Sequence, residues 1–539
     1  EGVFCSRFCV QPDFPRRAPP RRAKMPPAAA SKARELKKGI CADASRRQRE
    51  DTTIALRKAK REESMSKRRN LAVETDDLPD VPGAPPSPEK VAMPMPTLAD
   101  IPRLLAEIQS GDPAVVTAAT RGWRKLLSIE PAPPVDEVLS TGVVDILARL
   151  LHHHGHPDLQ FEAAWALTNI ASTERTQAVI DAGVVPTMIQ LCRSSSPDVR
   201  EQCIWCLGNI AGDSTASRDM VIGAGALEPM LANIVTPAST SLLRNATWAI
   251  SNLCRGKPQA DLERLRPAIP VLVDLLRKDD VDTLMDACWS LSYLTDGDEA
   301  RIQAVVDVGA CAALAPLLAH ESHKVVTPAL RTIGNIVTGN DVQTQAALNA
   351  GVLHFANSLI RSTKKAVLKE TCWLVSNIAA GTPEQTQAVV EQCDLVKLIV
   401  EQLEIGDWEV QKEATWVVSN ILSSNARAHA EQLVSYGVVK PLCKLLSVRD
   451  PKVVLVSLEA LEAILKIETF GKGILATTLI DEAGGVDSIE TLQEHENNGV
   501  YDKAISIIET YFGGDDENST LAPNVDAAAG TFAFGVAGN

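Results

Sequence analysis

Aromatic residues are scarce in this sequence: they make up 4% of its 539 residues, although 45% are hydrophobic. A core of Ala, Leu, Val and Ile suits helices packed on helices. No apolar run reaches 18 residues, so no membrane span is expected, and there is no clear signal peptide. A P-loop, a nucleophile elbow and paired carboxylates in a pocket-like context are also missing. We therefore expect neither an enzyme nor a bound cofactor.

Motifs for metal or redox chemistry are weak. The 12 cysteines are scattered, mostly over predicted helices, which is typical of small buried thiols in a reducing compartment. Cys203 and Cys206 form a C-x-x-C pair without a second pair, and we expect them to pack inside a helix. The His-rich stretch from His152 to His156 falls in an inter-repeat loop with only Asp158 nearby, so no metal site is expected.

Against this background, the few tryptophans stand out because they repeat. Five of the 8 begin the tetrad Trp-x-x-x-Asn: Trp165/Asn169, Trp205/Asn209, Trp248/Asn252, Trp373/Asn377 and Trp416/Asn420. Two imperfect copies, Trp289/Tyr293 and Arg331/Asn335, lie between the third and fourth, and successive first positions are 40 to 43 residues apart. A period of this length marks a helical solenoid of the armadillo or HEAT type.

Each unit opens with a Gly-containing turn before an apolar helix, as at Gly183, Gly225, Gly309, Gly351 and Gly437, and its tetrad helix comes last. The array should run from residue 98 to 512. Its first unit contains Trp123 with Leu127 four residues on, the atypical repeat expected at a solenoid end. Because residues i and i+4 share a helical face, the tetrads should form one ladder of indoles and amides, which we place on the concave surface.

The charge is divided unevenly along the chain. Residues 1–70 carry 20 Lys and Arg against 8 Asp and Glu, and the remainder carries 34 against 60. Residues 1–33 are expected to be disordered, 34–70 to be a basic arm, 71–97 a flexible acidic and Pro-rich linker, and 513–539 a disordered tail. The arm could be a solvated charged tail, a helical ligand followed by an extended basic peptide, or a DNA-contacting region, which lacks any DNA-binding scaffold downstream.

The residues beside the tetrads indicate what the ladder binds. Buried Asn side chains need hydrogen-bond partners, and an extended peptide could supply them through its backbone. Several acids lie close by: Glu201, Asp213, Asp282, Asp286, Asp296, Asp341 and Glu413. Slots walled by indoles and closed by carboxylates suit Lys or Arg side chains. The sequence thus favours a ligand rich in Lys and Arg, and a purely structural ladder is the alternative.

At this point the residues resemble a known family, the importin α adaptors of nuclear import. The resemblance runs from about residue 34 to 512 and rests on the arm SRRQRED…LRKAKREE…KRRN, on FEAAWALTNIAS, EQCIWCLGNIAGD, NATWAISNLCRGKP, DACWSLSYLTDGD, TPALRTIGNIVTGND, KETCWLVSNIAAG and KEATWVVSN, and on HENNGVYDKAISIIETYF. It implies an all-α, right-handed superhelical armadillo-repeat solenoid of about ten repeats with an N-terminal importin-β-binding arm. It also implies an adaptor that shuttles between cytoplasm and nucleus.

The resemblance assigns roles to individual residues. Its major site for nuclear localisation signals would comprise Trp165, Asn169, Thr176, Glu201, Trp205, Asn209, Asp213, Trp248, Asn252 and Asp286. Its minor site would comprise Arg331, Asn335, Asp341, Thr344, Trp373, Ser376, Asn377, Glu413, Trp416 and Asn420. Importin β would contact Arg46, Arg47, Arg49, Arg57, Lys58, Lys60 and Arg61. The segment Lys67, Arg68 and Arg69 would occupy the major site when importin β is absent.

The implied partners are cargo proteins, importin β, a recycling exportin at the last repeat and, further, nucleoporins; direct nucleic-acid binding is not expected. One departure from the family pattern follows Asn169. The loop reads Ser172-Thr173-Glu174-Arg175-Thr176, two residues shorter than in the family and without its Gly, whose carbonyl helps hold the key lysine. The competing function is an armadillo scaffold or adhesion module without an import role. Its groove should be lined by Lys and Arg, whereas acids flank this ladder.

Overall fold

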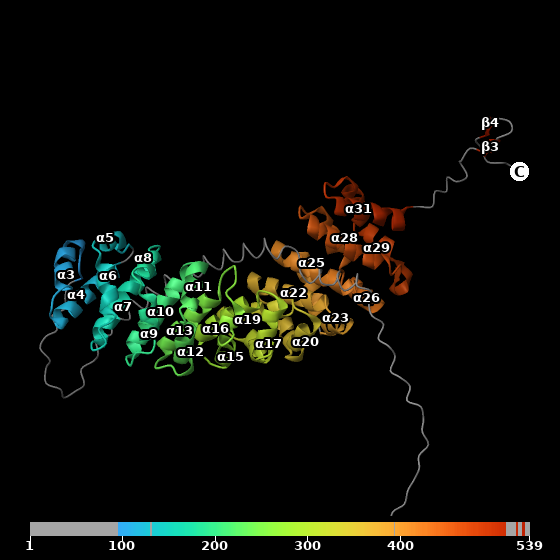
Figure 1. Cartoon of the computed structure of the whole chain (residues 1–539). Helices are drawn as coiled ribbons and strands as arrows, with labels where there is room; N and C mark the ends of the chain where they lie inside the picture. The colour runs from blue at the N-terminus through green and yellow to red at the C-terminus, as the bar shows by residue number, and fades with distance from the viewer. Residues whose placement is uncertain (1–94, 130–131, 393, 514–523, 527–530, 534–539) are drawn as a thin grey trace, which may run out of the picture.

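The computed structural model describes residues 95–129, 132–392, 394–513, 524–526 and 531–533. The expectations for residues 1–33, for the arm 34–70 and for linker residues 71–94 concern parts of the chain outside these. The described residues form an elongated stack of helices, with α3 near one end and α31 near the other (Figure 1).

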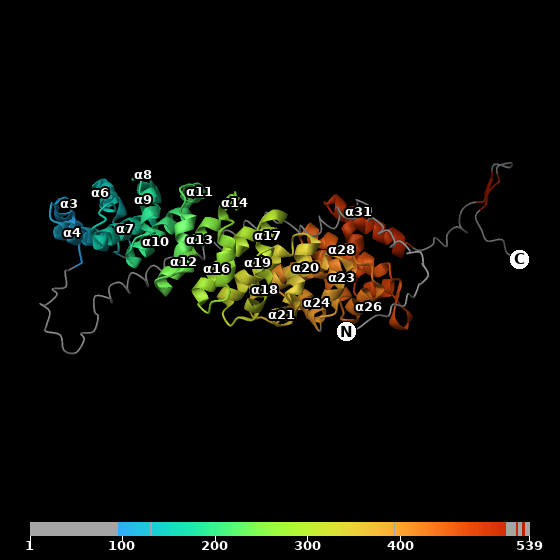
Figure 2. The same cartoon turned by 60° about the horizontal axis from the view of Figure 1, so that its bottom comes forward.

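Ten long helices form the spine of the described part of the chain, and each packs on the next in sequence order (Figure 2). They are α4 (Pro113–Leu126), α7 (Pro157–Ala171), α10 (Pro197–Asp213), α13 (Thr240–Cys254), α16 (Val281–Thr295), α19 (His323–Ile336), α22 (Lys365–Ala379), α25 (Trp408–Leu422), α28 (Pro451–Leu465) and α31 (Asn498–Ile507). The predicted armadillo-type solenoid of about ten repeats is thereby confirmed.

Shorter helices precede each long one and complete its repeat. They are η1 (Leu98–Asp100), α3 (Ile101–Glu107), α5 (Val135–Ser140), α6 (Val143–Leu150), α8 (Thr176–Asp181), α9 (Val185–Leu191), α11 (Thr215–Gly223), α12 (Leu227–Val235), α14 (Leu262–Leu265), α15 (Ala268–Leu275), α17 (Glu299–Val306), α18 (Ala310–Leu314), η2 (Ala315–Ala319), α20 (Asp341–Asn349), α21 (Val352–Leu359), α23 (Pro383–Val390), α24 (Leu395–Ile405), α26 (Arg427–Ser435), α27 (Val439–Lys444) and η3 (Leu445–Ser447).

Local sequence explains where the long helices begin. Pro occupies the first position of α4, α7, α10 and α28, where its missing N–H is not needed. The side chains of Ser196 and Asp280 cap α10 and α16 by accepting from the backbone N–H three residues later. The predicted Gly turns are confirmed, because Gly183, Gly225, Gly309, Gly351 and Gly437 all have positive φ. The repeat that ends with α25 lacks this Gly, and there Asp394 adopts the same left-handed conformation, with a φ of 60°.

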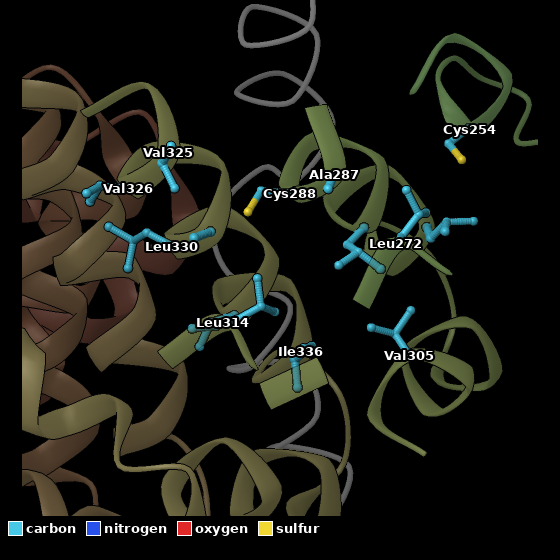
Figure 3. Packing of buried hydrophobic residues seen from close by; sticks show 14 of the residues in the cluster. Cys254, Leu272, Ala287, Cys288, Val305, Leu314, Val325, Val326, Leu330 and Ile336 are labelled. Atoms are coloured by element: carbon cyan, nitrogen blue, oxygen red, sulfur yellow. The ribbon is translucent and has the colours of Figure 1, made fainter. Parts of the chain in front are cut away.

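A continuous core runs along the stack between neighbouring repeats. It is almost entirely aliphatic, and Figure 3 shows Leu272, Leu314 and Leu330 packed with Cys288 between α15 and α19. Fully burying one such Leu contributes about 1.5–3 kcal/mol, so the stack is held by many interchangeable contacts. Because the core uses the inward-facing sides of the helices, any binding surface must be formed by their other faces.

The last repeat is less regular. Strands β1 (Thr469–Phe470) and β2 (Ile474–Leu475) pair antiparallel around η4 (Gly471–Gly473) and lead into α29 (Ala476–Glu482), α30 (Gly485–Thr491) and η5 (Leu492–Glu494). A π-helical turn, η6 (Ile508–Phe512), ends the array. Within 513–539, where no regular structure was expected, β3 (Asn524–Asp526) pairs antiparallel with β4 (Thr531–Ala533). Val525, Thr531 and Phe532 favour extended backbone, so the expectation is wrong for these strands.

Among the helices of the described ranges, none alone combines the length and hydropathy of a membrane span. One pair bent by 70°, Glu299–Val306 with Ala310–Ala319, meets the two criteria jointly.

Candidate peptide-binding ladder

The Trp/Asn ladder lies on seven consecutive long helices, from α7 to α25. Each helix carries one first position (Trp, or Arg331 on α19) and, four residues later, one second position (Asn, or Tyr293 on α16). Because the seven helices stack side by side, the tetrads repeat in one direction along the array, as the sequence predicted.

The Asn side chains join each repeat to the one before it. Four of them donate from Nδ2 to a backbone carbonyl three residues after the preceding first position: Asn209 to Thr168 at 3.3 Å, Asn252 to Gly208 at 2.9 Å, Asn335 to Ser292 at 2.8 Å and Asn420 to Ser376 at 2.8 Å. Half of each of these four amides is therefore structural. The sequence had not indicated this use.

The other half of several amides is left over. Oδ1 of Asn209, Oδ1 of Asn420 and Nδ2 of Asn377 are buried, with no hydrogen-bond partner among the residues that the structure describes. A buried polar atom without a partner costs about 1–3 kcal/mol. All three atoms belong to second positions of the ladder.

Two of the indoles pack closely against a glycine of the preceding long helix. A Cβ on Gly208 would approach Trp248 Cζ3 to 2.5 Å, and one on Gly334 would approach Trp373 Cζ3 to 2.3 Å, so these two contacts require Gly. Trp165 and Trp205 are 7% and 8% exposed, whereas Trp248, Trp373 and Trp416 are half-buried. At the imperfect fourth rung, Trp289 stacks on Tyr293 at 5.9 Å between ring centroids. The indoles thus offer faces and edges in a fixed orientation.

The three acids predicted for the major site lie on two helices, α10 and α16. Asp213 is the last residue of α10 and is exposed, Asp286 on α16 is buried, and Glu201 on α10 is half-buried. Glu201 accepts hydrogen bonds from Ser241 and Asn245 of the next repeat. Of the other acids beside the tetrads, Asp282 pairs with Arg244 and Asp296 with Lys257. Of these five acids, Asp213 is the one that is exposed.

The minor-site residues lie on α19, α20, α22 and α25. Asp341 opens α20 and is exposed, while Thr344 is buried and donates to the carbonyls of Val337 and Asn340. Ser376 accepts from Asn420 through its carbonyl, and Glu413 is half-buried beside Trp416 in the sequence. The ladder therefore continues across this second set of rungs.

The arginine of the irregular rung is held by a buried acid. Arg331 makes an ion pair with Glu370 of the next repeat, whose side chain is 4% exposed. Burial works against the charge on Arg331, but the attraction of Glu370 and the hydrogen bond to it prevail and raise the pKa of Arg331. Arg331 also lies over Trp373, with 5.8 Å from its Cζ to the ring centroid. This side chain is a fixed cation in the ladder.

Sequence reasoning missed Glu162 and Glu370. Both acids lie three residues before a tetrad Trp, at the same position as Asp286 and Glu413, so a signal for them was present. Trp123 is fully buried and its Nε1 donates to the Leu104 carbonyl at 3.4 Å, which makes it a core residue. The first repeat thus departs from the pattern of the later ones, as was expected for the end of a solenoid.

The loop after Asn169 is shorter than its counterparts, as the sequence indicated. Thr344 and Thr386 each donate to a carbonyl seven residues earlier, at the end of the preceding long helix. Thr176 makes the same kind of bond to Ala171 over five residues, and a second one to the Thr173 carbonyl, both at 3.0 Å. The Thr173 carbonyl thus lies beside the predicted lysine pocket. Arg175, on this loop, forms a two-pronged ion pair with exposed Asp136.

The His-rich stretch and the C-x-x-C pair are the two remaining motifs of the sequence. His152 and His154 lie near Thr187 and Gln160, and the described residues contain no group of three or more His, Cys, Asp or Glu arranged to hold a metal. Cys203 and Cys206 are buried in α10, and burial raises the pKa of both thiols, that of Cys206 to about 12. Such thiols remain protonated and unreactive.

Comparison with known proteins agrees with this architecture. A family model described as importin beta binding domain matches residues 34–121. The armadillo/beta-catenin-like repeat matches residues 131–172, 172–212, 214–255, 267–296, 298–338 and 382–423, and an atypical Arm repeat matches 476–524. Importin subunit alpha-4 of Arabidopsis thaliana is 44% identical over 494 residues, which cover 90% of this chain and 92% of that protein. The chain belongs to the importin α family.

Other importin α proteins are similarly close. Importin subunit alpha-1b of Oryza sativa subsp. japonica is 43% identical over 81% of this chain and 83% of its own length. Importin subunit alpha-B of Dictyostelium discoideum is 44% identical over 90% of this chain and 93% of its own length. The crystal structure of an engineered protein, 29% identical, superposes with a TM-score of 0.70 over 77% of this chain and 100% of that chain. As an importin α, this chain is a non-enzymatic nuclear import adaptor with an importin-β-binding domain and an armadillo array.

Proposed function

We propose that the ladder binds the Lys/Arg-rich nuclear localisation signals of cargo proteins as extended peptides, at two sites. The observation that carries the proposal is the set of orphaned Asn atoms on Asn209, Asn377 and Asn420. An extended peptide presents backbone N–H and C=O groups at regular intervals, and these would satisfy the free ends of the amides.

Indoles and acids define the side chains that this peptide should carry. The aliphatic stem of a Lys packs on an indole, and its cation gains about 0.5–2 kcal/mol from the ring. Asp213 at the end of α10 and Asp341 at the start of α20 are exposed carboxylates that could then meet the head group. In the major site we assign the principal lysine to Asp213, Thr176 and the Thr173 carbonyl.

The two sites are separated by two incomplete rungs, each of which lacks either the Trp or the Asn of the tetrad. Trp289 is followed by Tyr293 instead of Asn, and Arg331 replaces the indole beside Asn335. A single ligand with two basic clusters could span both sites, and a single cluster would use one of them. An armadillo scaffold for acidic partners would need cations along the ladder, whereas its exposed charges at Asp213 and Asp341 are negative.

We infer that the arm, residues 34–70, regulates the ladder. Its net positive charge suits the same acidic surface, and Lys67, Arg68 and Arg69 resemble a ligand. While the arm occupies the ladder, the apparent affinity for cargo falls by the fraction of molecules left open. Importin β, by binding the basic residues from Arg46 to Arg61, would remove this competitor.

The test is fluorescence anisotropy with a labelled Lys-Lys-Lys-Arg-Lys peptide. Deletion of residues 1–70 should tighten binding, and adding importin β to the full chain should have the same effect. Affinity that is unchanged by either would refute autoinhibition. A full chain and a deletion variant that both fail to bind the peptide would refute the binding function itself.

Recycling would complete the cycle of a shuttling adaptor. We infer that the last repeat, with exposed Glu494, Glu496, Asp502 and Glu509 around α31, meets a recycling exportin. Charge reversal at Glu494 and Glu496 should abolish capture by the exportin and leave peptide binding intact. Loss of both together would instead indicate misfolding of the array. Nucleoporins are a further partner class for the same shuttling step.

A further inference from the structure

The hydrogen bonds of the amides locate the rung that precedes Trp165. In four rungs of the ladder, Asn Nδ2 bonds the carbonyl three residues after the previous first position. Asn169 contacts the Arg124 carbonyl at 3.4 Å, and also Ser128 Oγ at 2.9 Å. By the same rule, the first and second positions of the first repeat are Arg121 and Lys125, where later repeats carry Trp and Asn.

The rung before each run of Trp/Asn tetrads is therefore built alike. Arg121 pairs with Glu162, three residues before Trp165, at 2.6 Å. Arg331 pairs with Glu370, three residues before Trp373. Both glutamates have side chains that are 4% exposed. The same Arg–Glu–Trp arrangement thus occurs at the low-numbered end of both proposed sites.

These ends are already filled by cations of the chain itself. Arg124 Cζ lies 4.1 Å from the centroid of Trp165, and its Nε lies 2.5 Å from Glu162 Oε2. Arg331 Cζ lies 5.8 Å from the centroid of Trp373. An indole face covered by an internal guanidinium cannot accept a ligand cation, and a carboxylate held by that guanidinium cannot attract one.

Resting on the proposed function, we propose that Arg121–Glu162–Arg124 and Arg331–Glu370 are end stops that limit how many consecutive Lys or Arg side chains each site accepts. Trp165, Trp205 and Trp248 leave two slots between complete rungs, and Trp373 and Trp416 leave one. A peptide whose basic run is longer than the site should therefore bind no more tightly, because its next cation would meet an arginine of the chain.

One substitution tests the second stop. Arg331→Trp completes a Trp/Asn rung, since Asn335 is already present. The added indole would face Ser292, and the ladder tolerates small residues at this position, as with Ser376 before Trp416. Glu370 would then lose its ion pair with Arg331. The major site is silenced in the same chain by Trp205→Ala and Asn209→Ala, so that only the second ladder is measured.

The probes are a core Lys-Arg peptide flanked by Ala, whose basic run does not exceed the single slot of the parent, and two versions in which one flanking Ala, before or after the core, is Lys. The parent chain should bind all three within about twofold. The Arg331→Trp variant should bind one lengthened peptide about tenfold more tightly than the core, which corresponds to about 1.4 kcal/mol. Equal binding of the three peptides by the variant would overturn the proposal, as would the same preference in the parent.

Controls separate this effect from general charge and from misfolding. Arg361→Trp removes an exposed arginine elsewhere and should bring no preference for length. If Arg331→Trp lowers the melting temperature, Arg331→Ala replaces it; this variant removes the guanidinium from Trp373 and from Glu370, and it should show the same preference more weakly. Arg124→Ala, with the major site intact, should likewise give the major site a preference for a peptide with a longer basic run. A parent chain that binds no peptide would refute the proposed function instead of the end stops.

Discussion

Asn420 Nδ2 donates a hydrogen bond to the carbonyl oxygen of Ser376, 2.8 Å away and 44 residues earlier in the chain. The same amide leaves its oxygen buried without a partner among the described residues. One side chain therefore serves the scaffold with its nitrogen, and we propose that it serves the ligand with its oxygen.

Asn420→Ala should separate these two uses. Loss of the ligand's hydrogen bond should weaken binding of a basic peptide at the second site about tenfold, and loss of the bond to Ser376 should lower stability by about 1–2 kcal/mol. Anisotropy and thermal melting measure the two effects on the chain lacking residues 1–70. Asn349→Ala, an exposed Asn on α20, is the matched control and should change neither. Unaltered peptide binding by Asn420→Ala would show that its oxygen is not a ligand contact.

Asp213→Lys should abolish binding at the major site. Replacing an attractive charge by a repulsive one near a ligand cation costs about 2–4 kcal/mol close to a protein surface, or roughly 100-fold in affinity. Titration with a peptide that carries a single basic cluster measures this loss. Asp198→Lys makes the same change at the exposed start of the same helix and should have little effect. Equal losses in both variants would indicate a long-range effect of charge instead of a site.

Asp280 makes the stability of the stack depend on pH. Burial favours its protonated form, but hydrogen bonds from Arg244 and Thr283 prevail and lower its pKa to about 2 from 3.8. A group whose pKa is lower in the folded state stabilises the protein above the unfolded-state pKa and loses this effect as pH falls. Relative to Asp280→Asn, which retains a capping oxygen, the native chain should be more stable by about 1–2 kcal/mol at pH 6.

This advantage should disappear between about pH 4 and pH 2. Thermal melting of the two proteins across that range gives the difference directly. A difference that is independent of pH would assign the effect to capping geometry instead of charge.

Arg175 gives the shortened loop a test of its own. Asp136 holds this arginine by two hydrogen bonds, at 2.8 and 3.1 Å. Asp136→Ala should release a cation next to Thr176 and weaken lysine binding at the major site about threefold at low salt. Arg175→Ala should not weaken it, and the double variant should match Arg175→Ala. The effect should vanish in 0.5 M salt, about the regime in which exposed charges are screened; persistence there would point to a change in loop structure.

The sequence was sufficient for the repeat and for most of the ladder, because a period near 42 residues and an i,i+4 pair need no tertiary information. It was not sufficient for the first repeat. Trp123 resembles a rung in type but lies two residues from the first position at Arg121, and only the bond from Asn169 reveals this offset. Glu162 was overlooked for a related reason: a buried acid is meaningful only once its arginines, 41 and 38 residues away, are brought beside it.

The long helices touch in single file, each with the one before and the one after. In such a stack a disturbance should fade over a few repeats, because the main contacts of each described long helix are with its neighbours in the array. A ligand that contacts several rungs at once would couple the stability of repeats that do not touch each other directly. The melting temperature of the adaptor should then rise with the length of the bound cargo peptide, because a longer peptide bridges more repeats.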